Sequence, residues 1–327
     1  MQTTTLDQIR NQLEDRRERL EEAVARVGPE EDLVRLLAQV DAALGRIGTD
    51  DYGTCLVCEG KIEESDLLAN PLLPYCLCDL TPDQQRALEH DLGLARRIQT
   101  ALLPNPDARS THWDAHYRYE PAGPVSGDYC DLWSRPGEDG TLYFAMGDVS
   151  GKGVAASLLM AHLHAFFHSQ PEGKVELGTL VQRANRLLLE STLPTHYATI
   201  VVGRANTAGE VEIVNAGHCP PMVWRSGGLQ TLSTTGFPIG LMEDKPFGST
   251  RLTLSPGEAL LLYTDGLTEA RRSDGAEYGT ERVEGVLEEF GRADARHLVR
   301  HLREDLSDFL AGESRHDDLS LLVIRRT

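Results

Sequence analysis

Residues 142–154 read LYFAMGDVSGKGV and lead directly into the helical sequence AASLLMAHLHAFF. The apolar run is typical of a β-strand, and the glycines after it allow a tight turn that leaves the Asp148 carboxylate projecting from the strand end. A phosphate-binding loop is the obvious alternative. It is disfavoured because GDVSGKG is one residue too short before Gly151-Lys152, and Gly153 stands where a serine or threonine should hold magnesium.

Asp148 is one of four carboxylate positions in similar surroundings. The others are Gly127-Asp128, Asp265-Gly266 and Asp317-Asp318, each at a predicted strand end or turn. One Asp-Gly pair is usually an ordinary turn, but four such positions beside apolar strand runs predict a shared acidic cleft.

From about residue 112 onward, short β-rich runs alternate with helical ones. Strands are predicted at TLYFAMGDV, YATIVVGRA, EVEIVNAG, GEALLLYTDG and LSLLVIR, and helices near 154–168, 176–193 and 280–312. Strands separated by turns, with helices grouped between them, predict an α+β layered domain over residues 105–327.

The first 48 residues carry two apolar stripes with helical spacing. An apolar residue recurs every seven positions from Leu6 to Val27, Gly28-Pro29 interrupts the pattern, and a second stripe runs from Leu33 to Ile47. Two short helices with one stripe each can cover each other, so we expect a helical hairpin over residues 1–48.

A further helix is predicted over residues 81–104. Thr81 suits the N-cap, Pro82 suits the first helical position, and the helix should end before Pro104. Its apolar stripe predicts a connecting helix that forms a homodimer through residues 82–103.

A zinc site is predicted from clustered cysteines. Cys55 and Cys58 are followed, after 17 residues, by Cys76 and Cys78, so two close pairs can supply four tetrahedral ligands. The second pair is one residue tighter than usual, and Asp79 stands at the usual spacing. The fourth ligand is therefore Cys78, which we favour because thiolate binds zinc strongly, or Asp79.

The hairpin followed by YGTCLVCEGKIEESDLLANPLLPYC resembles the TraR/DksA-type zinc finger over residues 1–80, with the finger itself at 49–80. The resemblance implies one structural Zn²⁺. In that family the hairpin enters a channel of RNA polymerase, so polymerase contact is one expectation. The other, which we favour, is a structural or sensory module.

The second resemblance covers residues 94–327. Six blocks, in the family order, resemble the SpoIIE-like branch of the PPM metal-dependent phosphatases: SGDYCDLW, AMGDVSGKGVAASLLMA, NAGHCPP, GFPIGLM, LLLYTDGLTEAR and RHDDLSLLVIR. The resemblance implies two packed antiparallel β-sheets flanked by helices, an α-β-β-α sandwich. It also implies a protein serine/threonine phosphatase whose substrate is a phosphorylated bacterial signalling protein, such as an anti-sigma-factor antagonist in stress signalling.

The same resemblance implies a centre of two Mn²⁺ or Mg²⁺ ions. Asp148 would bridge the ions, the Val149 carbonyl would assist, and Asp128, Asp265 and Asp317 would complete the site. Hard divalent cations prefer such oxygen ligands, and a pair of them activates water. Asp318 is expected to cap or hydrogen-bond, although adjacent aspartates are not separable by sequence.

Some positions depart from the family pattern. Ser126 and Cys130 replace residues of a GGDYYD block, and Ser150 and Lys152 occupy the region where eukaryotic relatives have a histidine. The proton donor is therefore not assigned. His218 is a candidate, but we favour a structural role for it, and Cys130 and Cys219 are expected to be packing residues.

Composition narrows the classes further. The 327 residues carry a net charge of −19, which disfavours nucleic-acid binding. The sequence contains no apolar run long enough to predict a membrane span. Without an export signal and with clustered cysteines, the chain is expected in the cytoplasm.

The alternative function is a non-catalytic regulator that binds a partner or the transcription machinery. It is disfavoured because a binding module has no reason to keep mutually repelling acids.

Overall fold

The computed structural model describes residues 3–27, 31–48, 51–55, 60–73, 82–134, 140–151, 153–170, 175–192, 196–243, 245–313, 315 and 317–327. They form two compact units, residues 1–91 and residues 92–327. No helix among the described residues is both long enough and apolar enough to cross a membrane.

The first unit is helical. Helices α1 (Thr3–Val27) and α2 (Glu31–Gly48) pack against each other through their apolar stripes, and the short helix α3 (Glu64–Ala69) joins the same core. The completely buried side chains of Ile9 and Val40 lie in this core. The two stripes therefore mark the buried faces, as their spacing predicts.

Helix α4 (Pro82–Leu102) begins and ends where the sequence predicts. The boundary between the units falls within it, after Asp91. Gln99 belongs to the second unit, where its amide donates to the Ser126 carbonyl at 2.7 Å and its Oε1 accepts from the Ser126 N–H at 3.1 Å. These two bonds attach the end of α4 directly beside Asp128.

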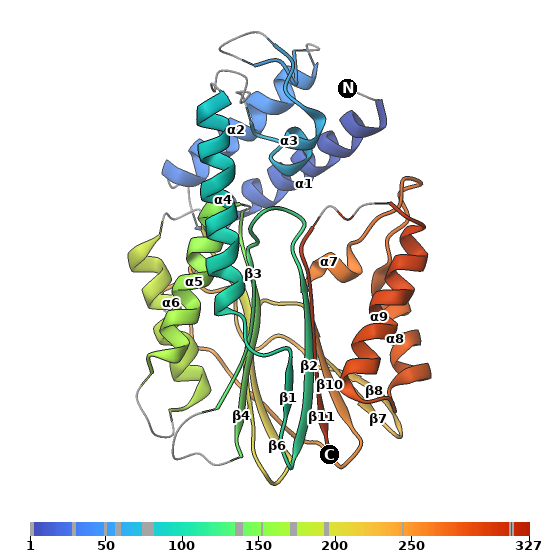
Figure 1. Cartoon of the computed structure of the whole chain (residues 1–327). Coiled ribbons are helices and arrows are strands. Elements are labelled where there is room, and N and C mark those ends of the chain that lie inside the picture. The colour runs from blue at the N-terminus through green and yellow to red at the C-terminus, as the bar shows by residue number, and fades with distance from the viewer. Residues whose placement is uncertain are drawn as a thin grey trace. The chain divides into compact units, whose positions relative to one another are not determined.

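Two antiparallel sheets form the centre of the second unit (Figure 1). The six-stranded sheet has the order β1-β2-β11-β10-β7-β8, with bounds Asp107–Arg109, Trp113–Glu120, Leu319–Arg326, Ala259–Tyr263, Met222–Arg225 and Gly228–Thr231. The five-stranded sheet has the order β3-β4-β5-β6-β9, with bounds Asp128–Trp133, Leu142–Val149, Ala198–Ala205, Glu210–Ala216 and Thr250–Thr253.

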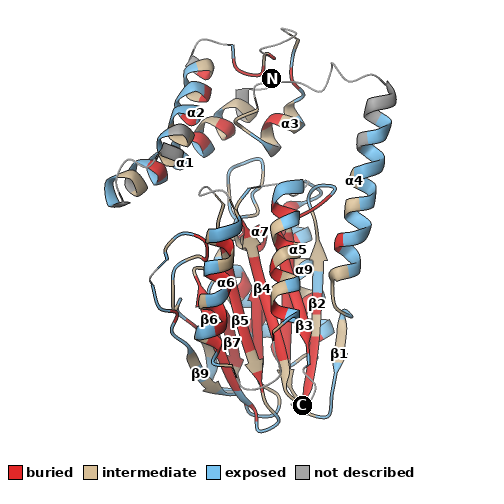
Figure 2. Ribbon diagram, turned by 90° about the vertical axis from the view of Figure 1, so that its left-hand side faces the viewer, coloured by how far each residue is buried: buried red, intermediate tan, exposed pale blue. Residues whose placement is uncertain are grey.

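Helices cover the outer face of each sheet. Helices α5 (Val154–His168) and α6 (Leu177–Ser191) pack on the five-stranded sheet, and α8 (Gly279–Phe290) and α9 (Ala295–Leu310) pack on the other. Figure 2 shows buried strands between helices whose outer surfaces are exposed. The α-β-β-α arrangement implied by the sequence is therefore confirmed for this unit.

The helix expected over 280–312 is instead divided into α8 and α9. Gly291 ends α8 against the Trp224 ring, where an added Cβ would meet ring atoms at 2.3 Å. Asp294 then caps the next helix by accepting a hydrogen bond from the His297 N–H at 2.9 Å. The chain turns here because a close contact and a new N-cap coincide.

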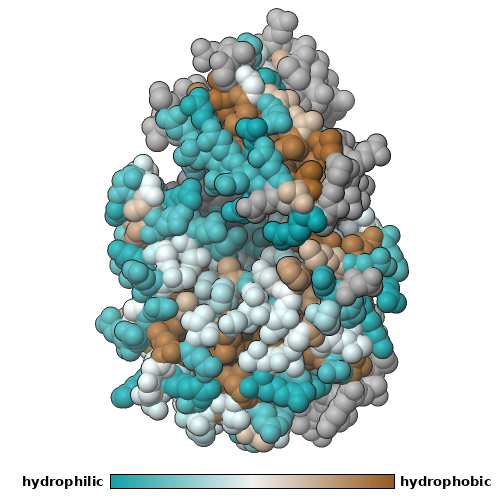
Figure 3. Space-filling model, turned by 180° about the vertical axis from the view of Figure 1, so that it is seen from behind, coloured by the Kyte–Doolittle hydropathy of each residue, from teal (hydrophilic) through white to brown (hydrophobic). Residues whose placement is uncertain are grey.

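Side chains alternate across the strands. In β3, Cys130 and Leu132 face the core between the two sheets, whereas Tyr129 and Trp133 face the core beneath α5 and α6. Successive strand residues point to opposite faces of the sheet, so even-numbered and odd-numbered side chains of β3 lie in different cores. On the surface seen in Figure 3, apolar side chains form small separate patches among hydrophilic ones.

Candidate metal centre

Asp128 and Asp148 lie opposite each other on neighbouring strands. Asp128 begins β3, Asp148 is near the end of β4, and their Cα positions are paired in the antiparallel register. A Cβ at Gly127 would lie 2.9 Å from the Val149 carbonyl oxygen and 3.4 Å from Asp148 Oδ1. Glycine at 127 therefore leaves both oxygens room for a ligand.

The other acids reach the same place from the six-stranded sheet. Thr264 directly follows β10 and precedes Asp265, while Ser320 follows Asp317 and Asp318 at the start of β11. The Ser320 N–H donates to Thr264 Oγ1 at 2.9 Å. Both hydroxyls then donate to Asp128 Oδ2, at 3.0 Å from Thr264 and 2.5 Å from Ser320.

The two adjacent aspartates play different structural roles. The Asp318 carboxylate accepts from the Ala122 N–H at 2.7 Å and from the Gly127 N–H at 3.2 Å. Asp317 is exposed, and its Oδ1 accepts from the Asp318 N–H at 3.0 Å. Asp318 therefore orders the loops around the site, while Asp317 lies on the exposed side of this pair.

Asp128 is buried beside other carboxylates. Its pKa is raised well above the ordinary value, first because it is buried and then because Asp148 and Asp318 repel its charge. Asp265 adds to the repulsion, and the Ser320 hydroxyl opposes it. A buried, mutually repelling set of carboxylates is a donor set that suits hard divalent cations, which supply the missing positive charge.

Ser150 stabilises the turn after β4. Its N–H donates to the Tyr197 carbonyl at 2.8 Å, and its Oγ accepts from the Tyr197 N–H at 2.9 Å. Lys152, the other candidate in this turn, lies outside the described residues. Ser150 thus holds the aspartate-bearing turn against the start of β5.

His218 is buried next to the site. Its Nδ1 lies 2.8 Å from the hydroxyl of Thr199, the residue paired with Asp148 in the sheet, and its N–H donates to Asn215 Oδ1 at 2.8 Å. Burial lowers the pKa of His218 to about 4. The ring is therefore uncharged at neutral pH, and its buried Nε2 has no hydrogen-bond partner among the described residues.

The cysteines divide into two groups. Burial raises the pKa of the Cys130 thiol, and burial together with the charges of Asp265 and Glu269 raises that of Cys219 to about 12. Both thiols stay protonated and lie against apolar cores, as expected of packing residues.

Of the zinc candidates, Cys55 is buried in the first unit. The rest of that set lies outside the described residues: Cys58, Cys76, Cys78 and Asp79.

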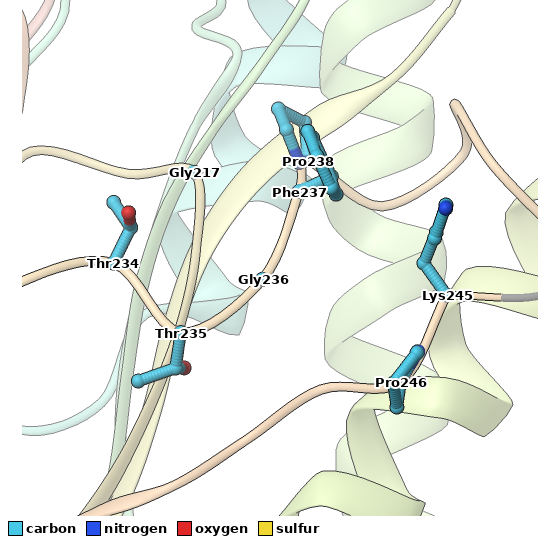
Figure 4. A pocket seen from close by; sticks show the side chains of 8 residues that line it. All are labelled: Gly217, Thr234, Thr235, Gly236, Phe237, Pro238, Lys245 and Pro246. Carbon is cyan, nitrogen blue, oxygen red and sulfur yellow. The ribbon is translucent and has the colours of Figure 1, made fainter.

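A separate cavity of about 540 Å³ opens beside the loop that carries His218. In Figure 4, Gly217 and the stretch from Thr234 to Pro238 lie on one side, and Lys245 and Pro246 on the other. Among the described residues, none of the aspartates of the metal centre lines this cavity, so it is a separate site. Its described lining offers a ligand the Phe237 ring, the Lys245 ammonium group and two threonine hydroxyls.

Sequence reasoning missed the hydroxyls of Thr264 and Ser320. Each stands next to or near a predicted aspartate, in TDG and DDLS, and this adjacency is the only signal that the sequence carries. It also missed that Asp131 contacts two histidines of α5. Those histidines stand four residues apart in a predicted helix, a spacing that places them on one face.

The chain is similar to known proteins in sequence. The family model described as Stage II sporulation protein E (SpoIIE) matches residues 138–327. Protein IcfG of Synechocystis sp. is 27% identical over 265 residues, which are 72% of this chain and 41% of IcfG, so the chain spans less than half of that relative. Phosphoserine phosphatase RsbU of Bacillus subtilis is 24% identical over 247 residues, covering 74% of this chain and 72% of RsbU.

Among solved structures, the SiaA PP2C domain of Pseudomonas aeruginosa has the same fold. It aligns with a TM-score of 0.64 and 20% identity, and the alignment covers 74% of this chain and 97% of that domain.

Proposed function

Because the chain belongs to the SpoIIE family of PP2C-type phosphatases, we propose that it is a metal-dependent protein serine/threonine phosphatase. One observation carries the proposal. Carboxylates from four separate places in the sequence converge at one end of the two sheets, and there they raise the pKa of Asp128. Such a cluster is costly without cations and suits their binding.

The metal ligands in this proposal are Asp128, Asp148, the Val149 carbonyl, Asp265 and Asp317. Two Mn²⁺ or Mg²⁺ ions bound there supply an activated water and neutralise developing charge on the phosphoryl group. Thr264 and Ser320 orient the Asp128 carboxylate through their hydroxyls. Asp318 holds the 122–127 loop through two backbone N–H groups and so positions Asp128.

The substrate in this proposal is phosphoserine or phosphothreonine on a bacterial signalling protein, specifically an anti-sigma-factor antagonist. The relative named phosphoserine phosphatase RsbU supports this class, because the alignment with it covers most of both chains. We place the protein in the cytoplasm, where clustered cysteines remain reduced.

The test is hydrolysis of phosphorylated candidate antagonists by the full chain with Mn²⁺, with Mg²⁺ or with a chelator. We expect activity only with a divalent cation, and a loss of at least about 100-fold in Asp148→Asn. Asp308→Asn is the matched control, because Asp308 is exposed on α9. Full activity of Asp148→Asn would overturn the mechanism, and inactivity of the unchanged chain on every substrate would favour a non-catalytic regulator.

We further propose that the first unit contains a TraR/DksA-like zinc finger with Cys55, Cys58, Cys76 and either Cys78 or Asp79 as ligands. The cysteine spacing and the buried position of Cys55 support it. Zinc content of the purified chain tests this. Cys55→Ser is expected to lose one zinc, and comparison of Cys78→Ser with Asp79→Asn identifies the fourth ligand. Unchanged zinc in Cys55→Ser would contradict the finger.

We also propose that the chain forms a homodimer through residues 82–103, which include α4. The side chains of Leu94 and Ile98 support it, since they are 43% and 55% exposed on α4. Sedimentation is expected to show a dimer that Ile98→Asp dissociates. Contact of the hairpin with RNA polymerase is the alternative use of the first unit, and co-sedimentation with the polymerase tests it.

A further inference from the structure

A second cluster of metal-binding side chain types lies between β3 and α5, the strand and helix packed together in Figure 1. Asp131 Oδ2 lies 2.7 Å from His168 Nε2 and 3.2 Å from His164 Nδ1. The two imidazole rings are stacked with centroids 4.3 Å apart. Two rings on one helical face are thus directed at a single carboxylate oxygen.

This cluster is distinct from the aspartate centre. Asp131 follows Asp128 by three residues, so the two side chains point to opposite faces of β3 and their Cα atoms are roughly 10 Å apart. Asp131 shares the face of Tyr129 and Trp133, beneath α5. None of the three cluster residues belongs to the proposed catalytic ligand set.

The Asp131 carboxylate is buried without a permanently charged partner among the described residues. Its side chain is only 1% exposed, and its ion-pair partners among the described residues are the two histidines. Tyr129 Oη also donates to Oδ2 at 2.7 Å, and the Leu132 N–H donates to Oδ1 at 2.8 Å. A buried carboxylate with only neutral or titratable partners lacks a permanent counter-charge, which a bound cation would supply.

We propose that Asp131, His164 and His168 bind a divalent transition-metal ion of the Zn²⁺ class. Three ligand atoms within 4.8 Å of one another are present. Tetrahedral ligands about 2.0 Å from zinc lie roughly 3.3 Å apart, which is close to the distances of 2.7 Å and 3.2 Å from Asp131 Oδ2 to the two histidine nitrogens. The imidazole nitrogens that now donate to Asp131 become ligands when their protons move or leave.

Access and orientation support the same assignment. The side chains of His164 and His168 are 18% and 39% exposed, so an ion reaches them from solvent. The Leu132 N–H holds the carboxylate through its other oxygen, Oδ1, as outer partners do at metal sites, while Tyr129 Oη donates to the same Oδ2 that the histidines contact. Three protein ligands leave a fourth position for water.

The donor set also predicts selectivity. Imidazole favours Zn²⁺, Co²⁺ and Ni²⁺ over Mg²⁺, whereas the oxygen-only aspartate centre suits Mg²⁺ or Mn²⁺. The bound ion would join α5 to β3 and so stabilise the helix that follows the Asp148 turn. The inference does not depend on phosphatase activity.

The test compares metal content of the full chain after equilibration with Zn²⁺ or Co²⁺. His164→Gln and His168→Gln are each expected to bind one ion fewer per chain than the unchanged protein, and the Co²⁺ form to lose part of its visible absorption. His162→Gln is the matched control, because His162 is on the same helix but outside the cluster. Because the metal content of each variant is subtracted from that of the unchanged protein, ions bound at the cysteine and aspartate centres cancel.

A second measurement needs no variant. Crystals of the unchanged chain soaked in Zn²⁺ are expected to show an anomalous peak within coordination distance of Asp131, His164 and His168. Equal metal content in the folded histidine variants, or the absence of a peak at the three side chains, would overturn the proposal. Circular dichroism of each variant separates loss of the site from loss of the fold.

Discussion

Ser320 donates a hydrogen bond of 2.5 Å to Asp128, a residue 192 positions earlier in the sequence. Ser320 is on β11 of one sheet and Asp128 begins β3 of the other. The Ser320 hydroxyl, like that of Thr264, thus joins the two sheets at the acid cluster. It also lowers the pKa of Asp128 against the effects of burial and like charge.

Removing that hydroxyl should weaken metal binding. In Ser320→Ala, we expect the Mn²⁺ concentration for half-maximal activity to rise about 10- to 100-fold, because partners that orient a ligand contribute about this much to metal affinity. Activity at saturating Mn²⁺ should stay near that of the unchanged chain. The measurement is a Mn²⁺ titration of the phosphatase rate. Ser307→Ala, at an exposed position of α9, is the control. An unchanged Mn²⁺ requirement in Ser320→Ala would contradict the proposed role of Ser320 in orienting Asp128.

The metal-free protein should be destabilised by ionised Asp128. Its folded pKa is raised above the unfolded value near 3.9, so the free energy of unfolding falls as pH rises from about 4 through the folded pKa. In chelator at neutral pH, Asp128→Asn should therefore melt higher than the unchanged chain, and this gain should vanish near pH 4. Thermal scans at both pH values test it. A lower melting temperature for Asp128→Asn at neutral pH would show that hydrogen bonding outweighs repulsion.

Asp131 should have the opposite pH dependence. Although burial raises its pKa, hydrogen bonds from His164, His168 and Tyr129 outweigh burial and lower the pKa to about 2. Its contribution to stability is present above the unfolded pKa near 3.9 and is lost as pH falls toward about 2. Urea unfolding of metal-free protein should show a smaller acid-dependent loss in Asp131→Asn than in Asp308→Asn. Identical slopes would rule out this linkage.

Gly266 should tolerate no side chain. An added Cβ would lie 1.9 Å from the Asp318 carbonyl oxygen, so Gly266→Ala must separate the segment after Asp265 from the one at Asp318. We expect about 1–3 kcal/mol of destabilisation and reduced metal-dependent activity. Gly285→Ala is the matched control, since nothing lies within 4 Å of its added Cβ on α8. That change should stabilise by roughly 0.5–1 kcal/mol. Equal stability of both variants would refute the close-contact argument.

Local signals in the sequence determined much of the fold. The apolar run ending at Val149 and the helix beginning at Val154 lie where predicted, because a buried strand, a glycine turn and an apolar helix each have their own composition. The same holds for α4, whose proline start marks its boundary. The break between α8 and α9 was missed because it depends on Gly291 meeting Trp224, which is distant in sequence.

For the site, the sequence by itself supplied the carboxylates and their turns. It determined that Asp128, Asp148, Asp265 and the 317–318 pair lie at strand ends or turns, since glycine and aspartate beside apolar runs are local features. Only the tertiary structure decided that Thr264 and Ser320 meet Asp128 and that Asp131 turns away toward His164 and His168. Those outcomes depend on strand register and side-chain parity, and a shift of one residue would reverse them.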